Sequence, residues 1–452
     1  MPAVRPRELL SVDKNTGIRF LTLISSLTRG GTERAAVNYA FGYHRAGFPS
    51  AVLAYGGGGT REAQLRAEGI PVFIGGESPP ELERAAAEAR EWAPDILHLN
   101  RPGIADATSA AAIRALIHPR LRVLETNVFG YVDSSPDRMM IDLHLHLSRW
   151  CLWKWTQSIK GVEPRSPGVV IPYSVDASSF NVNSPEARIA NRRSFGIPDS
   201  AFVFGRIGQP SAPKWSPDLI TAFEAVAKME PKAWLAVCGL PDTLQAMAAR
   251  LPAEVRSRVV ELPITNSDAE LSRYYSLMDT FVHVSEKGES FGMVLCEAML
   301  CEIPVITMSS PLRDNSQIEV VPSGKAGIVV QDLPGLIRAM SDIQKDDAAF
   351  QSMRHYSRQS VTDRFDIPVV TRQLISVAQI ALAANSSQEL ARRLAENRNF
   401  QSAAPARLYR DLLASANLTP SLSDRILASL VNQPFSRQAI TFARALQARI
   451  RD

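Results

Sequence analysis

Short apolar segments alternate with longer amphipathic segments along most of this 452-residue chain. Strands that alternate with helices form βαβ units, whose strands are parallel and share one sheet. The first apolar segments are Arg19–Ser25, Ser50–Tyr55 and Pro71–Ile74, and helical patterns lie between them at Thr32–Ala46 and Arg61–Glu68. Later segments are apolar throughout, as in strands buried on both faces: Val203–Gly205, Trp234–Cys238, Phe281–Val284 and Val305–Met308. The sequence therefore predicts an α/β protein built on parallel sheets.

This rhythm breaks near the middle of the chain, which predicts two domains. Val169–Pro172 resembles a strand, residues 176–193 are polar, and a second βα series starts at Phe202. We expect two Rossmann-like domains that face each other across a cleft. The predicted boundaries are residues 1–172 for the N-terminal domain, 173–366 for the C-terminal domain, 367–385 for a helix that returns toward the N-terminal domain, and 386–452 for a helical C-terminal extension.

Composition and charge exclude several classes of protein. Lys and Arg number 50 against 46 Asp and Glu, and this net charge of +4 is too small to indicate a nucleic-acid partner. No apolar run reaches the roughly 18 residues of a membrane-spanning helix. Residues 1–10 lack the apolar core of a secretory signal. The four cysteines form no C-x-x-C pair, which favours free thiols in a reducing, cytoplasmic compartment.

The segment 284–299 carries the clearest chemical signal. A strand is expected to end before a short loop, and Ser290 is suited to cap the helix that follows. The backbone N–H groups of Phe291, Gly292 and Met293 would then lie free at the helix N-terminus. Because the helix dipole favours negative charge there, the segment predicts an anion-binding site.

Two glutamates of this segment have different surroundings. Glu289 lies in the loop, whereas Glu297 lies eight positions later, about two helical turns on, among apolar residues. A buried carboxylate is costly without hydrogen-bond donors. The vicinal diol of a nucleotide ribose would supply two donors, and an interior arginine or backbone amides would satisfy the carboxylate equally well.

Two cations and a glycine pair are further candidates for ligand binding. Arg206 ends an apolar strand, at the edge where open α/β sheets bind ligands, and Lys214 follows before a helix start. Such a pair suits a diphosphate, although a surface pair without a ligand is the alternative. Gly30 and Gly31 would let the backbone approach a ligand, or would simply form a tight turn. The sequence contains no G-x-x-x-x-G-K-[ST], which excludes a P-loop NTPase.

Together these residues resemble the retaining glycosyltransferases of the GT-B fold, in the large family four group. The resemblance runs in order over residues 18–380. It rests on the motifs Gly30-Gly31-Thr32-Glu33-Arg34, Pro94-Asp95-Ile96-Leu97-His98, Ile171-Pro172 with Val175-Asp176 and Phe180, the basic pair Arg206 and Lys214, and an E-x7-E pattern made by Glu289 and Glu297. The E-x7-E pattern with its flanks is the specific part of this match.

The resemblance implies roles for these residues. It implies that Glu297 binds ribose hydroxyls and that Glu289 lies near the donor sugar. Arg206 and Lys214 would neutralise the leaving diphosphate, which makes Glu289, Lys214 and Arg206 the candidate catalytic residues. The remaining donor-binding candidates are Glu297, Ser290, Phe291, Gly292, Met293, Gly30 and Gly31. No metal or resident cofactor is implied, and the nucleotide-sugar co-substrate is expected to carry UDP or GDP.

The implied activity is transfer of a hexose from this donor to a carbohydrate or lipid-linked acceptor in surface polysaccharide or glycoconjugate synthesis. A GT-B-fold sugar-nucleotide epimerase and a non-catalytic nucleotide-sugar-binding scaffold are the alternatives. A lipid-linked acceptor would bring a peripheral contact with the inner face of the membrane. The helical extension could cap the fold, bind a partner or mediate self-association, since its helices must bury their Leu and Ile residues.

Three further features bear on this expectation. Many relatives place a histidine near Asn127, which can bond a hydroxyl but cannot carry a proton. His98 could face the cleft, although a lone histidine is more often structural. Three tryptophans could form a membrane-edge patch or, in the interpretation we favour, pack inside a partly buried helix: Trp150, Trp153 and Trp155.

Overall fold

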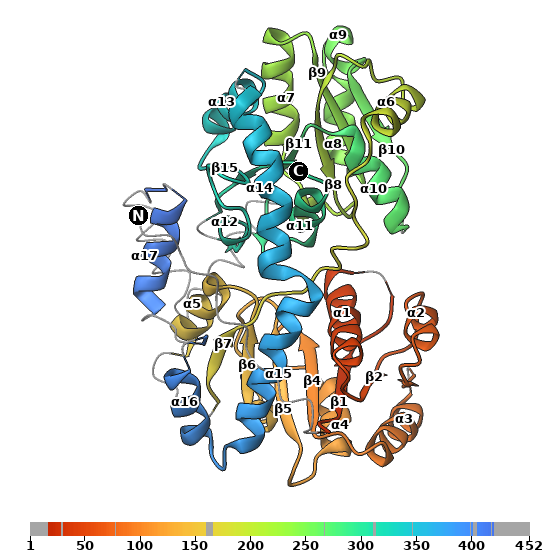
Figure 1. Ribbon diagram of the computed structural model, residues 1–452, viewed down its shortest axis with the longest axis vertical. Helices are drawn as coiled ribbons and strands as arrows, with labels where there is room; N and C mark the ends of the chain where they lie inside the picture. The colour runs from red at the N-terminus through yellow and green to blue at the C-terminus, as the bar shows by residue number, and fades with distance from the viewer. Residues whose placement is uncertain are drawn as a thin grey trace. The chain divides into compact units, whose positions relative to one another are not determined.

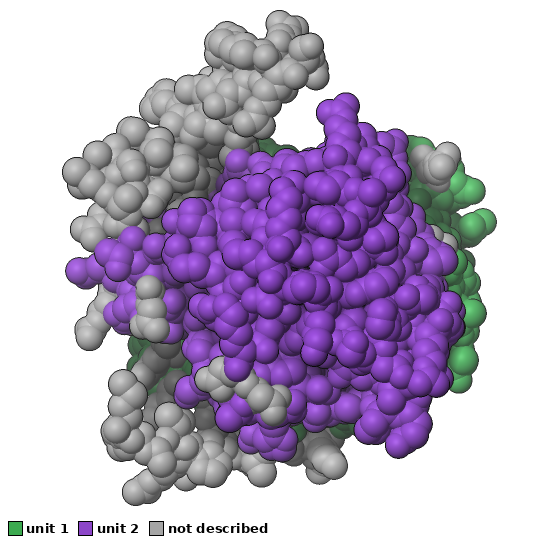
Figure 2. Space-filling model, turned by 90° about the horizontal axis from the view of Figure 1, so that it is seen from above, with its two compact units in different colours: residues 1–146, 163–174, 367–402 green, residues 147–162, 175–366, 403–452 purple. Residues whose placement is uncertain are grey.

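The computed structural model describes residues 17–28, 30–76, 78–159, 166–265, 267–310, 313–345, 347–397, 399–400, 405–416 and 418–419. The chain divides into two compact units, coloured separately in Figure 2. Unit 1 comprises residues 1–146, 163–174 and 367–402, and unit 2 comprises residues 147–162, 175–366 and 403–452. Neither unit is therefore one continuous stretch of chain.

Unit 1 is built on a seven-stranded parallel sheet with the order β3-β2-β1-β4-β5-β6-β7. Its central strands are buried along their whole length, in agreement with their apolar sequences. The strands are β1 (Phe20–Ile24), β2 (Ser50–Ala54), β3 (Val72–Ile74), β4 (Ile96–Arg101), β5 (Arg122–Asn127), β6 (Leu143–His146) and β7 (Gly168–Val170).

The helices of unit 1 connect and cover these strands (Figure 1). Side chains define some of their ends, because Ser78 and Glu81 form a capping box and Asp106 accepts from two backbone N–H groups. The helices are α1 (Gly31–Arg45), α2 (Glu62–Ala67), α3 (Pro79–Glu91), α4 (Ala107–Leu116), α15 (Ile367–Ala383) and α16 (Ser387–Glu396), with a 3₁₀ turn at Pro136–Met140.

Unit 2 contains a six-stranded parallel sheet with the order β10-β9-β8-β11-β13-β15, and a two-stranded ribbon of β12 and β14. The six strands are β8 (Phe202–Ile207), β9 (Ala233–Cys238), β10 (Val259–Leu262), β11 (Thr280–His283), β13 (Val305–Met308) and β15 (Gly327–Val330). The ribbon pairs β12 (Gly288–Glu289) with β14 (Asp314–Asn315).

The helices of unit 2 include one from the stretch predicted as the N-terminal domain, residues 1–172, and one from the C-terminal extension. They are α5 (Arg149–Ser158), α6 (Pro185–Ser194), α7 (Asp218–Met229), α8 (Asp242–Ala249), α9 (Ala253–Arg256), α10 (Asp268–Leu277), α11 (Met293–Leu300), α12 (Gln317–Val320), α13 (Leu333–Asp342), α14 (Asp347–Phe365) and α17 (Pro405–Ser415), with a 3₁₀ turn at Ala212–Lys214.

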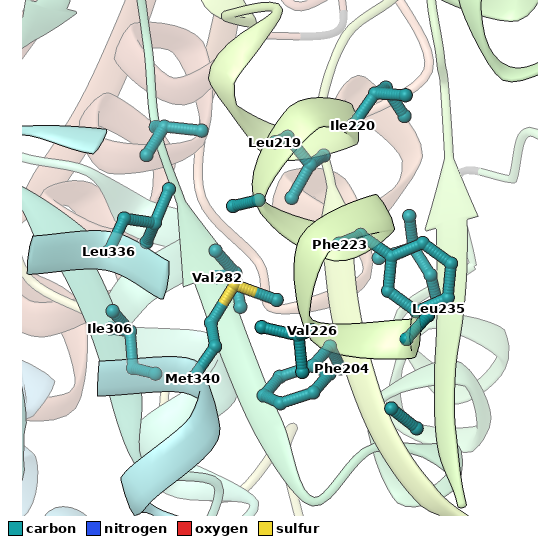
Figure 3. Close-up of a cluster of buried hydrophobic side chains, with 14 of the residues drawn as sticks. Phe204, Leu219, Ile220, Phe223, Val226, Leu235, Val282, Ile306, Leu336 and Met340 are labelled. Carbon is teal, nitrogen blue, oxygen red and sulfur yellow. The ribbon is translucent and has the colours of Figure 1, made fainter. Parts of the chain in front are cut away.

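A large core of unit 2 lies between its sheet and the helices α7 and α13 (Figure 3). Helix α7 presents Leu219, Phe223 and Val226, which recur at the three- and four-residue spacing of one helical face. These side chains meet Phe204 and Val282 of the sheet. Burial of each such side chain contributes about 1.5–3 kcal/mol, so this core fixes the strands from which the site loops emerge.

The two parallel α/β units agree with the predicted fold class, but several boundaries differ. Helix α5 belongs to unit 2, although we placed it inside a domain of residues 1–172. Helix α15 belongs to unit 1, and so does α16, which we assigned to the extension. Helix α6 lies in the polar segment 176–193, where the sequence pattern indicated no helix; it forms because Ser184 caps it and Pro185 suits its first turn.

The extension is helical where the structure describes it, in α16 and α17. The prediction for residues 420–452, like that for residues 1–10, falls outside the described residues. The described helices include none that is both long and apolar enough to cross a membrane.

Candidate functional site

The candidate donor residues lie on two loops that leave neighbouring strands of unit 2. Strands β8 and β11 are adjacent in the sheet, but their following helices lead to opposite sides, toward β9 and β13 respectively. Ligands of open α/β sheets bind at such a switch point, outside the carboxyl ends of the strands. The loop after β8 carries Lys214 and the loop after β11 carries Glu289, so the fold brings together residues 75 positions apart.

Glu289 is held by a lysine and a histidine. The Nζ atom of Lys214 lies 3.4 Å from both carboxylate oxygens of Glu289. The Nε2 atom of His283 lies 3.2 Å from Oε1 of the same carboxylate. Glu289 and His283 are buried, whereas the side chain of Lys214 is 35% exposed. The lysine is thus the most exposed member of this group.

The charges of this group follow from its surroundings. Burial alone would raise the pKa of Glu289, but the Lys214 ammonium, the His283 hydrogen bond and the Arg206 charge lower the pKa to about 2. Burial and the charge of Arg206 lower the pKa of His283 to about 4. At neutral pH the histidine is therefore uncharged, and Nε2–H can donate to Glu289 while Nδ1 faces the Thr307 hydroxyl at 3.5 Å.

Arg206 departs from the expected role, in which it contacts a diphosphate directly. Its side chain is only 1% exposed, and burial lowers its pKa to about 10, so it remains charged. One guanidinium nitrogen donates to the Ile207 carbonyl at 2.6 Å and another to the Lys214 carbonyl at 3.0 Å. The guanidinium also lies over the rings of Trp215 and Phe281. Arg206 therefore holds the backbone of Lys214 in place. Its positive charge is buried beneath the loop rather than exposed to a ligand.

The backbone around Glu289 is tightly constrained. Gly288 has a φ of +73°, and a Cβ atom there would lie 1.7 Å from the Asp314 carbonyl oxygen, so only glycine fits. The pairing of β12 with β14 continues in a hydrogen bond from the Ser316 N–H to the Glu289 carbonyl at 2.9 Å. These contacts fix the direction in which the Glu289 side chain leaves the loop.

The start of helix α11 also differs from the prediction. Ser290 does not cap the helix, because α11 begins at Met293 and its N-cap is Gly292, in the left-handed conformation with a φ of +90°. Phe291 packs edge-on against Phe365, with the ring centres 5.1 Å apart. The predicted residues thus lie in the turn that enters α11, but the turn depends on the backbone of Gly292 rather than on the Ser290 hydroxyl.

Glu297 is buried, as expected, and one partner is a tyrosine. The Tyr275 hydroxyl donates to Oε2 of Glu297 at 2.9 Å. Burial and the neighbouring carboxylate raise the pKa of Tyr275 well above its ordinary value, so the phenol keeps its proton. Neither an arginine nor a ribose is needed to explain this contact, and Tyr275 was not predicted because nothing in its local sequence marks it as a partner.

The candidates in unit 1 have other surroundings than we expected. A Cβ atom on Gly30 would lie 1.8 Å from the Glu33 carboxylate, so that side chain already fills the space beside this glycine. Gly30 is the N-cap and Gly31 the first residue of α1. His98 is fully buried, with Nδ1 2.9 Å from the Tyr43 hydroxyl and Nε2 2.8 Å from the Thr126 hydroxyl. His98 is therefore a core residue and not a cleft residue.

Asn127 remains a candidate for ligand contact. It is 1% exposed at the end of β5, and its Nδ2 donates to the Tyr131 carbonyl at 2.8 Å. Its Oδ1 atom has no hydrogen-bond partner among the described residues. A buried carboxamide oxygen without a donor is costly, so this atom is suited to accept from a hydroxyl.

Sequence reasoning missed a buried ionic network in unit 1. Arg101 donates to Glu125 at 2.5 Å and to Asp133 at 3.0 Å, and His144 lies 2.5 Å from the other oxygen of Glu125. Despite burial, which would raise it, the pKa of Glu125 is lowered to about 2 by His144 and Arg101. The available signal was the position of these charged residues within or at the ends of apolar strands.

The three tryptophans of α5 are buried, which contradicts the membrane-edge patch and confirms the packing interpretation. Within the described part of the chain, no group of three or more His, Cys, Asp or Glu side chains is arranged to hold a metal ion.

Comparisons with known proteins agree with this arrangement. The family described as glycosyl transferases group 1 matches residues 187–359, which include both site loops. A D-inositol 3-phosphate glycosyltransferase of Corynebacterium jeikeium is 29% identical over 200 residues, which are 42% of this chain and 46% of that protein. A GDP-mannose-dependent alpha-mannosyltransferase of Mycolicibacterium smegmatis is 25% identical over 48% of this chain and 56% of its own length. The chain thus spans about half the length of these curated relatives.

Solved structures show the fold. The Anabaena protein HepE, crystallised with UDP and glucose, has a TM-score of 0.63 at 19% identity and covers 80% of this chain and 99% of its own. A sucrose-phosphate synthase of Thermosynechococcus elongatus has a TM-score of 0.60 at 16% identity, over 81% of this chain and 100% of its own. The chain therefore has the GT-B fold, and the match to the glycosyl transferases group 1 family falls within unit 2 of that fold.

Proposed function

We propose that this protein is a retaining glycosyltransferase that moves a hexose from a nucleotide-sugar donor to a hydroxyl of a carbohydrate or lipid-linked acceptor. The group of Lys214, Glu289 and His283 at the switch point of unit 2 carries this proposal. It combines one accessible cation with one buried carboxylate, which suits a substrate that joins a diphosphate to a polyhydroxyl ring. The activities named for the relatives and the UDP bound to HepE support a nucleotide-sugar donor.

In the proposed reaction the bond between the sugar C1 and the diphosphate oxygen breaks, and a bond forms from the acceptor oxygen to C1 on the same face. The acceptor hydroxyl proton passes to the departing diphosphate. Lys214 stabilises the negative charge that develops on this diphosphate, and Arg206 holds the Lys214 backbone during the step. The step requires no resident cofactor beyond the nucleotide sugar, for which UDP and GDP are the candidate carriers.

The carboxylates take different parts in this proposal. Glu289 stays ionised because of Lys214 and His283, so it can accept hydrogen bonds from hydroxyls of the donor sugar. Glu297, held at Oε2 by Tyr275, is assigned to the ribose. Because His283 is uncharged, it orients Glu289 without competing with Lys214 for the diphosphate.

The first experiment is a thermal-shift and calorimetric screen of the full chain against UDP, GDP, ADP and their common sugar conjugates. A ligand in excess over its dissociation constant raises the melting temperature, so one base should give a clear shift. Lys214→Met should remove most of this shift, and Lys228→Met, an exposed lysine paired with Glu224 on α7, should leave it unchanged. No shift with any nucleotide would contradict the proposed donor site.

A second assay separates the enzymatic alternatives. The donor identified by the screen is incubated with and without candidate acceptors, and the anomeric configuration of the product is read by NMR. Retained configuration in an acceptor-dependent product supports the proposal. Conversion of the donor sugar without any acceptor would instead identify an epimerase.

We also propose that an acceptor attached to lipid brings the protein to a membrane surface. The tryptophans of α5 cannot supply that contact, because they are buried. Flotation with vesicles, with and without the lipid-linked acceptor, tests this part of the proposal, and light scattering of the full chain tests whether its C-terminal extension forms oligomers.

A further inference from the structure

Helix α5 is an unexpected part of unit 2. Its sequence lies between strands β6 and β7 of unit 1, and it falls outside the glycosyltransferase group 1 match at 187–359. Within unit 2 it contacts both β14 and α17. The helix therefore joins the C-terminal extension to the ribbon that carries Glu289.

The polar contacts of α5 converge on the segment 314–319. Lys154 donates to the Asp314 carboxylate at 2.7 Å, and both side chains are largely buried. The Ser148 hydroxyl, which caps α5, lies 2.6 Å from the Ser316 hydroxyl. At the first turn, the Arg149 N–H donates to Glu319 at 2.9 Å. These bonds fix α5 to both ends of the short segment that pairs with β12.

A further contact reaches the Glu289 loop directly. The Cys151 thiol lies 3.7 Å from the Ser290 carbonyl, to which it donates. Asp314 and Ser316 contact Glu289 and its neighbour Gly288 by backbone pairing, as described above. Helix α5 thus supports Glu289 from two sides, through the next residue in the chain and through the paired strand.

Helix α5 also packs against the C-terminal extension. One buried apolar cluster contains side chains from α5, α12, β15 and the α17 region: Trp150, Cys151, Trp153, Ile318, Val329, Leu412, Leu413, Ala416 and Leu418. Figure 1 shows α17 beside α5. The extension therefore buries apolar side chains inside unit 2, and Cys151 belongs both to this cluster and to the contact with the Glu289 loop.

We propose that α5, held in place by α17, is a positioning element for Glu289, with Ser148, Cys151 and Lys154 as its positioning residues. This inference rests on the proposed function for its catalytic consequence. A loop with few buried contacts samples many conformations, and each contact removed lowers the free energy of its local opening. Packing of α17 on α5 raises the free energy of opening for the Glu289 loop, so residues far outside the catalytic domain set the geometry of its carboxylate.

The first test uses the double variant Leu412→Asp/Leu413→Asp in the full chain. Both leucines are buried in the α5 cluster, whereas Ala414 on the same helix is exposed, so Ala414→Asp is the matched control. Hydrogen exchange should become about tenfold faster or more in peptides covering residues 286–292 and 314–319, and it should stay unchanged for the control. Faster exchange confined to α5 and α17 would overturn the proposal. This readout does not depend on any activity.

A second test keeps α17 in place and alters the bridge itself. Lys154→Met/Asp314→Asn removes both charges of the buried pair, which avoids an uncompensated carboxylate. If the screen above identifies a donor, we expect kcat to fall about tenfold with little change in KM for the acceptor, and Lys154→Arg to retain most of kcat. Unchanged kcat with unchanged exchange at 286–292 would contradict the assignment of Lys154. If the wild-type protein binds no nucleotide in the screen, that result would instead contradict the proposed function.

Discussion

The ammonium of Lys214 lies at the same distance, 3.4 Å, from both carboxylate oxygens of Glu289. This is a long contact for an ion pair that is partly buried, because charge-assisted N–H···O bonds are commonly about 2.7–2.9 Å. The lysine is thus attracted to Glu289 without being tightly bonded to it. A phosphate oxygen at this position can therefore replace Glu289 as the partner of the Lys214 ammonium with little loss of free energy.

Lys214→Met is expected to lower turnover by about 10²–10³-fold, since it removes a group that stabilises charge in the transition state. Lys214→Arg should keep part of the rate. Steady-state kinetics with the donor identified by the nucleotide screen measures the effect, with Lys228→Met as the exposed control. A wild-type rate for Lys214→Met would remove Lys214 from the mechanism.

Glu297→Gln is expected to weaken nucleotide binding about tenfold, equivalent to roughly 1.4 kcal/mol. The cause is the loss of a charged acceptor for ribose hydroxyls. Tyr275→Phe removes only the donor to Oε2 and should weaken binding less. Calorimetry with the nucleoside diphosphate measures both. Equal affinities in wild type and Glu297→Gln would show that Glu297 serves the core alone.

Gly288→Ala should destabilise unit 2 by about 1–3 kcal/mol beyond the cost of a left-handed alanine, because the methyl group would collide with the Asp314 carbonyl. Gly324→Ala is the control, since Gly324 has a φ of +76° and open space around its Cα. Urea unfolding of the two variants isolates the collision. Equal stabilities would mean that the β12–β14 ribbon moves apart without penalty.

Acid should destabilise unit 1 more steeply than unit 2. Burial lowers the pKa values of His98 and His146 in unit 1 to about 3, and that of His283 in unit 2 to about 4. Below the unfolded pKa of about 6.5, the unfolded state binds protons that these folded histidines do not bind. Stability is therefore lost as pH falls from 6.5, by up to about 1.4 kcal/mol per pH unit for each histidine, down to the folded pKa.

Hydrogen exchange at pH 7, 6 and 5 measures this difference, because peptides from each unit report its own opening. In His98→Asn, the free energy of unfolding of unit 1 should change with pH less steeply, by the slope that one bound proton contributes. His44→Gln, at an exposed position, should leave this slope unchanged. Identical pH dependence in the two units would rule out the buried neutral histidines as its source.

Periodicity predicted most elements because buried parallel strands must be apolar. The segments predicted as strands at Ser50–Tyr55 and Val305–Met308 are β2 and β13 within one residue. Helix α6 escaped prediction because its sequence is polar with few core residues, so that its Ser184 cap and Pro185 were the better signal. The local sequence pattern thus predicted a helix or strand wherever burial required apolar residues.

The site was only partly predictable because its contacts join distant segments. Glu289, Glu297 and Lys214 were recognisable from their local motifs. Their partner Tyr275 was not, since a tyrosine in a helix acquires such a role only from packing. The burial of Arg206 likewise depends on Trp215 and Phe281, whose rings close over it in three dimensions.

The division of unit 1 into separate stretches of chain has a consequence for biosynthesis. All strands of its sheet have been made once residue 174 is synthesised, but α15, whose carbonyls at Ala381 and Ala384 accept from Arg122, follows only after residue 366. At 5–20 residues per second, the ribosome needs about 10–40 s to make the intervening stretch. During that interval the nascent sheet lacks a helix that packs against α1, and it must persist incomplete or be shielded by other factors until α15 has been made.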